Sequence, residues 1–269
     1  MQATRNLPNF ERLSVLIATI LLAYAIARFV NLPGRDIPLQ FIGVYLALQI
    51  NAKTIIAIAV TGITATGTDW LLRDHRKLGK QSTLPHWILP GLTAWVITVP
   101  LNNLPVSPFW WAIFLGGGIL LLLVLIAEYI VVDPADIRYP AASIALIALS
   151  YALFLILAIS MRTIGLRLLV SLPPLGLAAG LICLRTIFLR LNRWQYPQAL
   201  TAALLIAQFV AAFHYLPLRP IPYGLALLAP AYAYTNFVIN LDQSQSPRQA
   251  MIEPLITLGA FLVMAAWLQ

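Results

Sequence analysis

The chain has 269 residues, of which 61% are apolar and 10% are charged, whereas an ordinary soluble domain has about 25% charged residues. Together with a mean hydropathy of +0.86, this composition excludes a soluble fold and indicates a polytopic membrane protein. The net charge of +8 comes from basic residues in short segments between apolar runs, so we expect no nucleic-acid partner. The single cysteine, Cys183, excludes a disulfide within the chain and a thiolate metal site.

A spanning helix needs about 20 mostly apolar residues, and nine segments fit that requirement. They are Leu13–Val30, Thr54–Leu72, His86–Leu101, Phe109–Val132, Pro140–Ser160, Leu166–Leu184, Ala199–Leu216, Ile221–Leu241 and Met251–Leu268. The first run follows Arg5 and Arg12 and could imitate a signal peptide, but we expect it to be retained as a membrane helix. The sequence predicts an all-α transmembrane bundle with nine or ten spans, in one integral membrane domain over residues 1–269.

The number of spans depends on one short segment, Ile37–Ile50. Its 14 residues fit a re-entrant or interfacial segment as well as a tilted span. The basic residues do not decide between these alternatives, because ten helices and nine helices both place 11 Lys and Arg on one side and 6 on the other. In either case the basic loop Arg73–Lys80 is predicted to face the cytoplasm and the C-terminus the outside.

Proline and glycine interrupt several of these segments. Pro173 and Pro174 precede a Gly176-x-x-x-Gly180 motif, and Pro230 lies inside a Tyr-rich run. Prolines of this kind kink membrane helices, and glycines at this spacing permit close helix packing. Both features are more often packing devices than parts of a transport pathway.

Polar residues within the apolar segments are the best candidates for a functional site. By the predicted orientation, the following lie near the inner ends of their helices: Asp69, Glu128, Arg185, Asn236 and Asn240. They could form a headgroup or ion site in the inner leaflet, or they could pair structurally and reach the interface.

The segment around Asp69 adds a second hypothesis. Arg73 follows Asp69 at i+4, so one helical turn can close an ion pair between them. Structurally, this is a helix end anchored by a basic loop. As a lipid-headgroup or phosphate site, its cations would be Arg73, Arg76, Lys77 and Lys80, with Asp69, Asp74 or His75 acting as base.

Familiar catalytic signatures do not occur in the sequence, including G-x-S-x-G, H-E-x-x-H and Gly-rich phosphate loops. The three histidines lack metal-ligand spacing, so we expect neither a metal ion nor a cofactor.

Three stretches resemble a family of uncharacterised bacterial polytopic membrane proteins. They are TGTDWLLRDH, which ends at His75, HWILPGLTAW at His86–Trp95, and RYPAASIALIALSYALFL at Arg138–Leu155. The resemblance implies a helix bundle in the bacterial cytoplasmic membrane. It implies no activity and no site residue.

Three functions remain open at this point, and an enzyme is the least favoured. The first is a subunit or scaffold of a membrane assembly, with the lipid bilayer, anionic headgroups and other membrane subunits as partners. The second is a carrier for a small solute or lipid. The third is a lipid-headgroup enzyme that uses the Asp69–Lys80 cluster.

Overall fold

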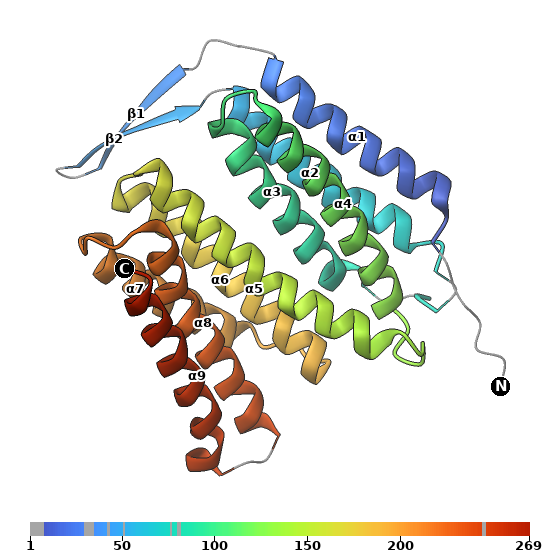
Figure 1. Cartoon of the computed structure of the whole chain (residues 1–269). Coiled ribbons are helices and arrows are strands. Elements are labelled where there is room, and N and C mark those ends of the chain that lie inside the picture. Colours follow the sequence, from blue (N-terminus) through green and yellow to red (C-terminus); the bar gives the residue numbers. More distant parts are fainter. Residues whose placement is uncertain are drawn as a thin grey trace. The chain divides into compact units, whose positions relative to one another are not determined.

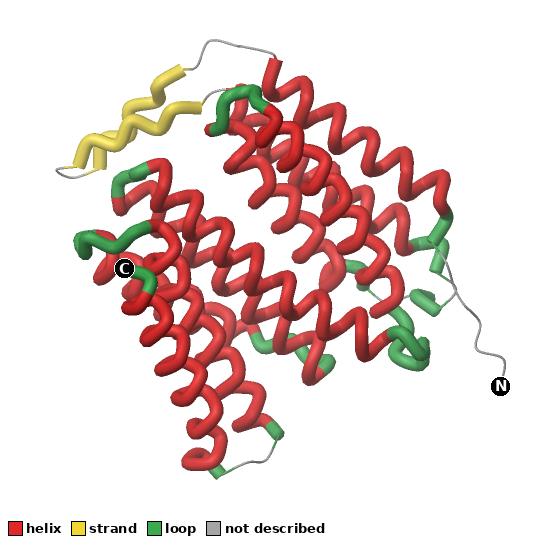
Figure 2. The backbone as a smooth tube through the Cα atoms, viewed as in Figure 1, coloured by secondary structure: helices red, strands yellow, loops and turns green. Residues whose placement is uncertain are grey.

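The computed structural model of the chain describes residues 8–29, 35–41, 44–50, 52–75, 77–79, 82–243 and 246–269 (Figure 1). It divides into two compact units, Met1–Tyr139 and Pro140–Gln269. Most of the described backbone is helical, as Figure 2 shows. The predicted fold class, an all-α transmembrane bundle, is therefore confirmed, while the prediction of one membrane domain stays untested.

The long helices coincide with the predicted segments to within a few residues. The first unit contains α1 (Phe10–Phe29), α2 (Ala52–Leu72), the 3₁₀ turn η1 (Leu84–Trp87), α3 (Ile88–Asn103) and α4 (Pro108–Val131). The second contains α5 (Tyr139–Ile164), α6 (Leu168–Leu191), α7 (Tyr196–His214), α8 (Pro220–Asp242) and α9 (Pro247–Trp267). Within the described ranges, nine helical segments are long and apolar enough to cross a membrane.

The short segment after α1 is a β-hairpin, so the alternative of a tenth spanning helix over Ile37–Ile50 is wrong, while the alternative of a re-entrant or interfacial segment stays a prediction. Strands β1 (Arg35–Phe41) and β2 (Val44–Ile50) pair antiparallel. The register places Ile37 opposite Leu48. A partial signal existed in β1, where Ile37, Leu39 and Phe41 are apolar at every second position, which favours a strand over a helix. The β2 segment is apolar at nearly every position and lacks this signal.

The packing of α1 against α2 shows that this hairpin does not cross the bundle. Nη1 of Arg12, at the start of α1, donates to the Trp70 carbonyl at 3.1 Å and lies 3.0 Å from the Asp74 carboxylate. Both partners lie at or just beyond the end of α2, so the two helices run antiparallel. The chain thus leaves α1 and enters α2 at the same end of the unit, which supports nine spans rather than ten.

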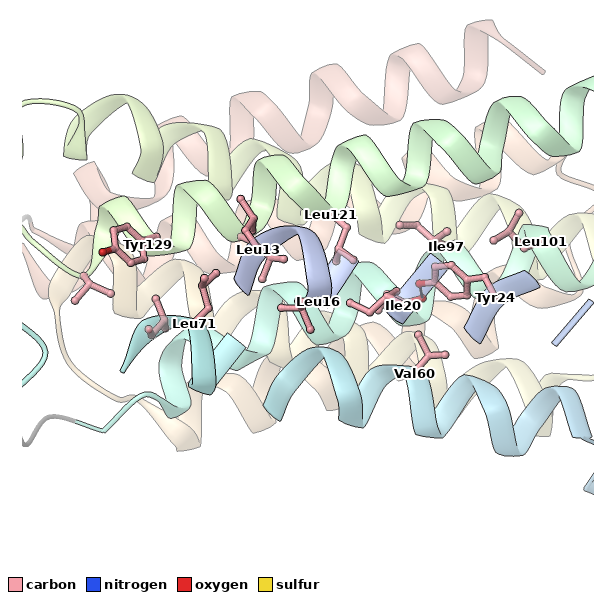
Figure 3. Close-up of a cluster of buried hydrophobic side chains, with 14 of the residues drawn as sticks. Leu13, Leu16, Ile20, Tyr24, Val60, Leu71, Ile97, Leu101, Leu121 and Tyr129 are labelled. Atoms are coloured by element: carbon pink, nitrogen blue, oxygen red, sulfur yellow. Dashed lines mark hydrogen bonds between the residues drawn. The ribbon is translucent and has the colours of Figure 1, made fainter. Parts of the chain in front are cut away.

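The first unit is held by an apolar core contributed by all four long helices (Figure 3). Leu13, Leu16 and Ile20 of α1 are buried in it, together with Leu121 of α4. Its polar atoms are satisfied by backbone groups, since the Trp110 indole donates to the Leu101 carbonyl at 3.0 Å. This satisfaction is required wherever lipid replaces water.

The second unit packs through small residues. A Cβ atom added at Gly180 of α6 would lie 3.1 Å from the Ala199 carbonyl oxygen of α7, so a larger residue would require the helix backbone to shift. Gly224 of α8 is packed in the same way against Leu155 of α5. The prolines predicted as interruptions lie inside continuous helices, α6 and α8.

Candidate functional site

We call one end of the first unit the charged end; it comprises the start of α1, residues 69–75, 77–79 and 82–87, and the end of α4 with residues 132–138. The threonines that lead to it along α2 are structural. Thr64 and Thr68 are buried, and their hydroxyls donate to carbonyls four residues earlier at 2.7 Å each. Each hydroxyl proton is therefore used within the helix.

Asp69 is engaged on both carboxylate oxygens. Arg73 Nε donates to Oδ2 at 2.7 Å, which is the ion pair expected from the i+4 spacing. The Thr83 hydroxyl donates to Oδ1. Asp69 therefore connects the end of α2 to Thr83, which lies just before η1 and α3.

From Thr83 the contacts continue to α4. The Thr83 carbonyl accepts from the His86 backbone N–H at 2.9 Å, and His86 Nδ1 lies 2.7 Å from Glu128 Oε2. Both side chains of this pair are buried. Asp69 and Glu128, two of the predicted site residues, are thus joined through Thr83 and His86.

The loop after α2 is tied down by further ion pairs. Lys77 Nζ lies 2.8 Å from Asp133 Oδ2, just past the end of α4. Hydrogen bonding to Lys77 is the largest of the effects that lower the pKa of Asp133. Among the proposed phosphate-binding cations, Arg73 and Lys77 are both in ion pairs, while Arg76 and Lys80 lie outside the described residues.

His75 is a buried residue of this loop and does not face solvent as a catalytic base would. Its ring packs edge-on against Tyr129, with the ring centroids 4.7 Å apart. Nδ1 accepts from the Lys77 backbone N–H at 3.3 Å. Burial is the main cause that lowers the pKa of His75, so the neutral ring is favoured.

A pocket of about 580 Å³ opens beside Asp69 and Arg73. Its polar lining includes Ser82 and Thr83, and Trp87 also lines it. The pocket thus combines one guanidinium, one carboxylate and several uncharged donors.

The remaining predicted site residues belong to the second unit. Arg185 was expected to end its helix, but α6 continues to Leu191, because Ile187, Phe188 and Leu189 extend the apolar run. Arg185 is fully buried inside α6, and its guanidinium lies 5.7 Å from the centroid of the Phe188 ring. Asp69 and Glu128 thus belong to the first unit and Arg185, Asn236 and Asn240 to the second, and a common inner-leaflet site formed by all five stays a prediction.

Asn240 and Asn236 lie on the α8 face that turns toward α9. The Asn240 amide donates to Glu253 of α9 at 3.4 Å. Asn236 Nδ2 is buried and has no hydrogen-bond acceptor among the described residues. One helical turn further along the same face, Tyr232 packs against the rings of Tyr151 and Phe261.

Sequence reasoning missed the partners of these residues, which are Thr83, His86, Asp133 and Glu253. His86 and Glu128 are 42 positions apart, so no local spacing connects them. A partial signal existed for Glu253, a carboxylate within an apolar segment. In the part of the chain that the structure describes, no three His, Cys, Asp or Glu side chains are grouped to hold a metal ion.

The comparison with family models gives one match, the family described as "Protein of unknown function (DUF5656)", over residues 32–268. The chain belongs to this family. The match begins after α1 and covers the hairpin and helices α2 to α9. No curated protein and no solved structure gives a match. DUF5656 membership thus supports the predicted resemblance to an uncharacterised family and assigns no activity.

Proposed function

We propose that this DUF5656 protein is a subunit or scaffold of a membrane assembly. In this assembly, a transmembrane helix of a partner packs against the exposed side of α2. The observation that carries the proposal is the use of glycine. Glycine inside a helix destabilises it by roughly 1 kcal/mol relative to alanine. A helix keeps such a residue most readily where a neighbour comes close.

Most glycines within the described helices have such a neighbour. A Cβ atom added at Gly67 would lie 2.1 Å from Leu16, and one at Gly117 would lie 2.8 Å from Ile97. Three others meet no atom within 4 Å, namely Gly62 on α2, Gly116 on α4 and Gly259 on α9. Close packing within the chain therefore does not explain these three.

The face around Gly62 is the best suited to a partner helix. Ala59 and Thr66, at i−3 and i+4, are exposed on the same side of α2. The Thr66 hydroxyl already donates to the Gly62 carbonyl at 2.9 Å, so this small face presents no unsatisfied group to an apolar partner. Small residues at this spacing let two membrane helices approach closely.

The test is native mass spectrometry of the full-length protein, released from its membrane in a mild detergent. We expect a mass above that of one chain, and we expect Gly62→Leu to lose the added mass without a lower melting temperature, because the site is open within the chain. Gly259→Leu, the same change at an open site on α9, is the matched control and should retain the added mass. A single-chain mass for the wild type, or full retention by Gly62→Leu, would refute the proposal.

We also propose that the charged end faces the cytoplasm of a bacterium. With nine spans, alternation places 11 Lys and Arg on the side of the charged end and 6 on the other, and cytoplasmic loops carry the excess of basic residues. In a Cys183→Ala background, single cysteines at Asn9 and Lys77 should be labelled only from the inside, and one at Asn103 only from the outside. Labelling of Asn9 and Lys77 from opposite sides would refute the nine-span arrangement.

A lipid-headgroup enzyme is the second candidate, favoured by the pocket that contains Asp69. Against it, both oxygens of Asp69 accept hydrogen bonds, which suits a positioning carboxylate better than a general base. A carrier would be supported by a cavity open to one side and lined by Pro230, Tyr232 and Asn236. Pro230 is buried and Tyr232 is held by two aromatic contacts, so these two contribute to packing.

A further inference from the structure

The pocket at the charged end has two kinds of wall. Asp69, Arg73, Ser82 and Thr83 form the polar part of its lining. The apolar part includes Leu84, whose exposed fraction is 53%. The pocket lies where a spanning helix, α2, ends, which is the depth of lipid headgroups.

Its unused hydrogen-bonding groups are donors. Arg73 is held by Asp69 through Nε, its side chain is 72% exposed, and its two Nη groups form no hydrogen bond within the described residues. The Trp87 indole nitrogen is buried and likewise has no acceptor in the described part of the chain. The Ser82 hydroxyl accepts from the Leu84 backbone N–H at 3.3 Å, which leaves its own proton available.

The acceptors of the pocket are occupied. Asp69 accepts from Arg73 and from Thr83, so its charge is compensated before any ligand arrives. A guanidinium whose Nε is fixed presents two Nη groups as a fork that matches the oxygens of a phosphate. The indole N–H is a donor only, so it suits an anion and not a cation, and the Ser82 hydroxyl can donate to the same anion.

We propose that this pocket binds a phosphate group, carried by an anionic lipid headgroup or by a small soluble phosphate ester, with Arg73 and Trp87 as its principal donors. Asp69 is a positioning residue that directs the Arg73 fork. The site does not depend on the helix partner proposed for α2, because none of its donors lies on the Ala59–Thr66 face.

The test measures lipid binding to the full-length protein in a neutral detergent by native mass spectrometry. The lipid probes are phosphatidic acid, phosphatidylglycerol and phosphatidylcholine with the same acyl chains. In a parallel arm, inorganic phosphate and glycerol 3-phosphate are tested as competitors. We expect the two anionic lipids to bind more tightly than phosphatidylcholine.

Arg73→Gln should weaken anionic-lipid binding about tenfold, equivalent to about 1.4 kcal/mol. Trp87→Phe keeps an aromatic ring but removes the N–H, and it should weaken binding by a smaller factor. The matched control is Arg193→Gln, which removes an exposed arginine that is also paired with an aspartate, Asp242, but in the second unit. Melting curves of all variants separate lost binding from lost folding.

Competition by the soluble phosphates would assign the site to a soluble ester, and its absence would assign it to lipid. The proposal is overturned if anionic lipids bind no better than phosphatidylcholine and soluble phosphates do not bind. It is also overturned if Arg73→Gln and Trp87→Phe bind the anionic lipids as well as Arg193→Gln does.

Discussion

Apolar packing is common to both units, but each unit adds its own kind of contact between distant segments. In the first, polar side chains connect segments that are distant in sequence, through the ion pairs Arg12–Asp74 and Lys77–Asp133 and the hydrogen-bonded pair His86–Glu128. In the second, Gly176 and Gly180 bring α6 against α7, and Gly224 brings α8 against α5. Ion pairs respond to pH and to the loss of one partner, whereas small-residue packing responds to side-chain volume.

The chain contains a natural reporter for each unit. Five of the seven tryptophans lie in the first unit, at positions 70, 87, 95, 110 and 111. The single cysteine, Cys183, is buried in the second, in a cluster with Ile187, Ala202 and Ile239. On heating, tryptophan fluorescence therefore reports mainly the unfolding of the first unit, and the reactivity of the Cys183 thiol reports the unfolding of the second.

The largest effect is expected from overfilling the second unit. Gly180→Leu would force a side chain against the Ala199 carbonyl and the Ala203 Cβ, both 3.1 Å from an added Cβ. A backbone carbonyl cannot move aside as the end of a flexible side chain can, so we expect the free energy of unfolding to fall by roughly 1–3 kcal/mol. Cys183 should react with a thiol-specific fluorophore at a lower temperature than in the wild type. An unchanged temperature would contradict the close-packing account of this unit.

A smaller effect is expected at Asp69 in the first unit. Thr83 is buried, whereas the Arg73 side chain is mostly exposed, so solvent screens the ion pair to roughly 0.5 kcal/mol or less. The buried hydrogen bond should contribute roughly 1 kcal/mol. Asp69→Asn should therefore lower the tryptophan-monitored melting temperature and show stronger coupling to Thr83→Val than to Arg73→Gln.

Two double-mutant cycles built on these three substitutions measure the couplings directly. No coupling of Asp69 to either residue, together with unchanged stability, would reject the structural role of this carboxylate and favour a functional one.

The smallest effect is expected from the pH dependence of His75. Its pKa in the folded protein is lowered by burial, so between that value and the unfolded pKa of about 6.5 the unfolded chain binds more protons. The stability contributed by neutral His75 is present above the unfolded pKa and is lost as the pH falls through the folded pKa.

We therefore expect the melting temperature of the first unit to fall between pH 7 and pH 5, and to fall less in His75→Phe, which retains an aromatic ring against Tyr129. The pKa of Asp133 is lowered from an ordinary value near 4, so its contribution is lost only at lower pH. An equal fall in both proteins would show that His75 is not responsible.

Much of this architecture is determined locally and was therefore predictable. Nine apolar segments of spanning length predicted nine helices, because a backbone in lipid must satisfy its hydrogen bonds within the segment. The Asp69–Arg73 pair follows from helical geometry alone. The hairpin formed by β1 and β2 was not predicted, because a length of 14 residues indicates neither helix nor strand.

Only the tertiary structure decided which distant residues meet. The partners of Glu128 and Lys77 are His86 and Asp133, and neither pair has a local spacing that indicates it. The structure also decided that α1 begins beside the end of α2, where Arg12 meets Asp74, which the balance of basic residues left open. The physical reason is that hydrophobicity and helical period act along the chain, whereas the depth and pairing of a polar side chain depend on which helices pack together.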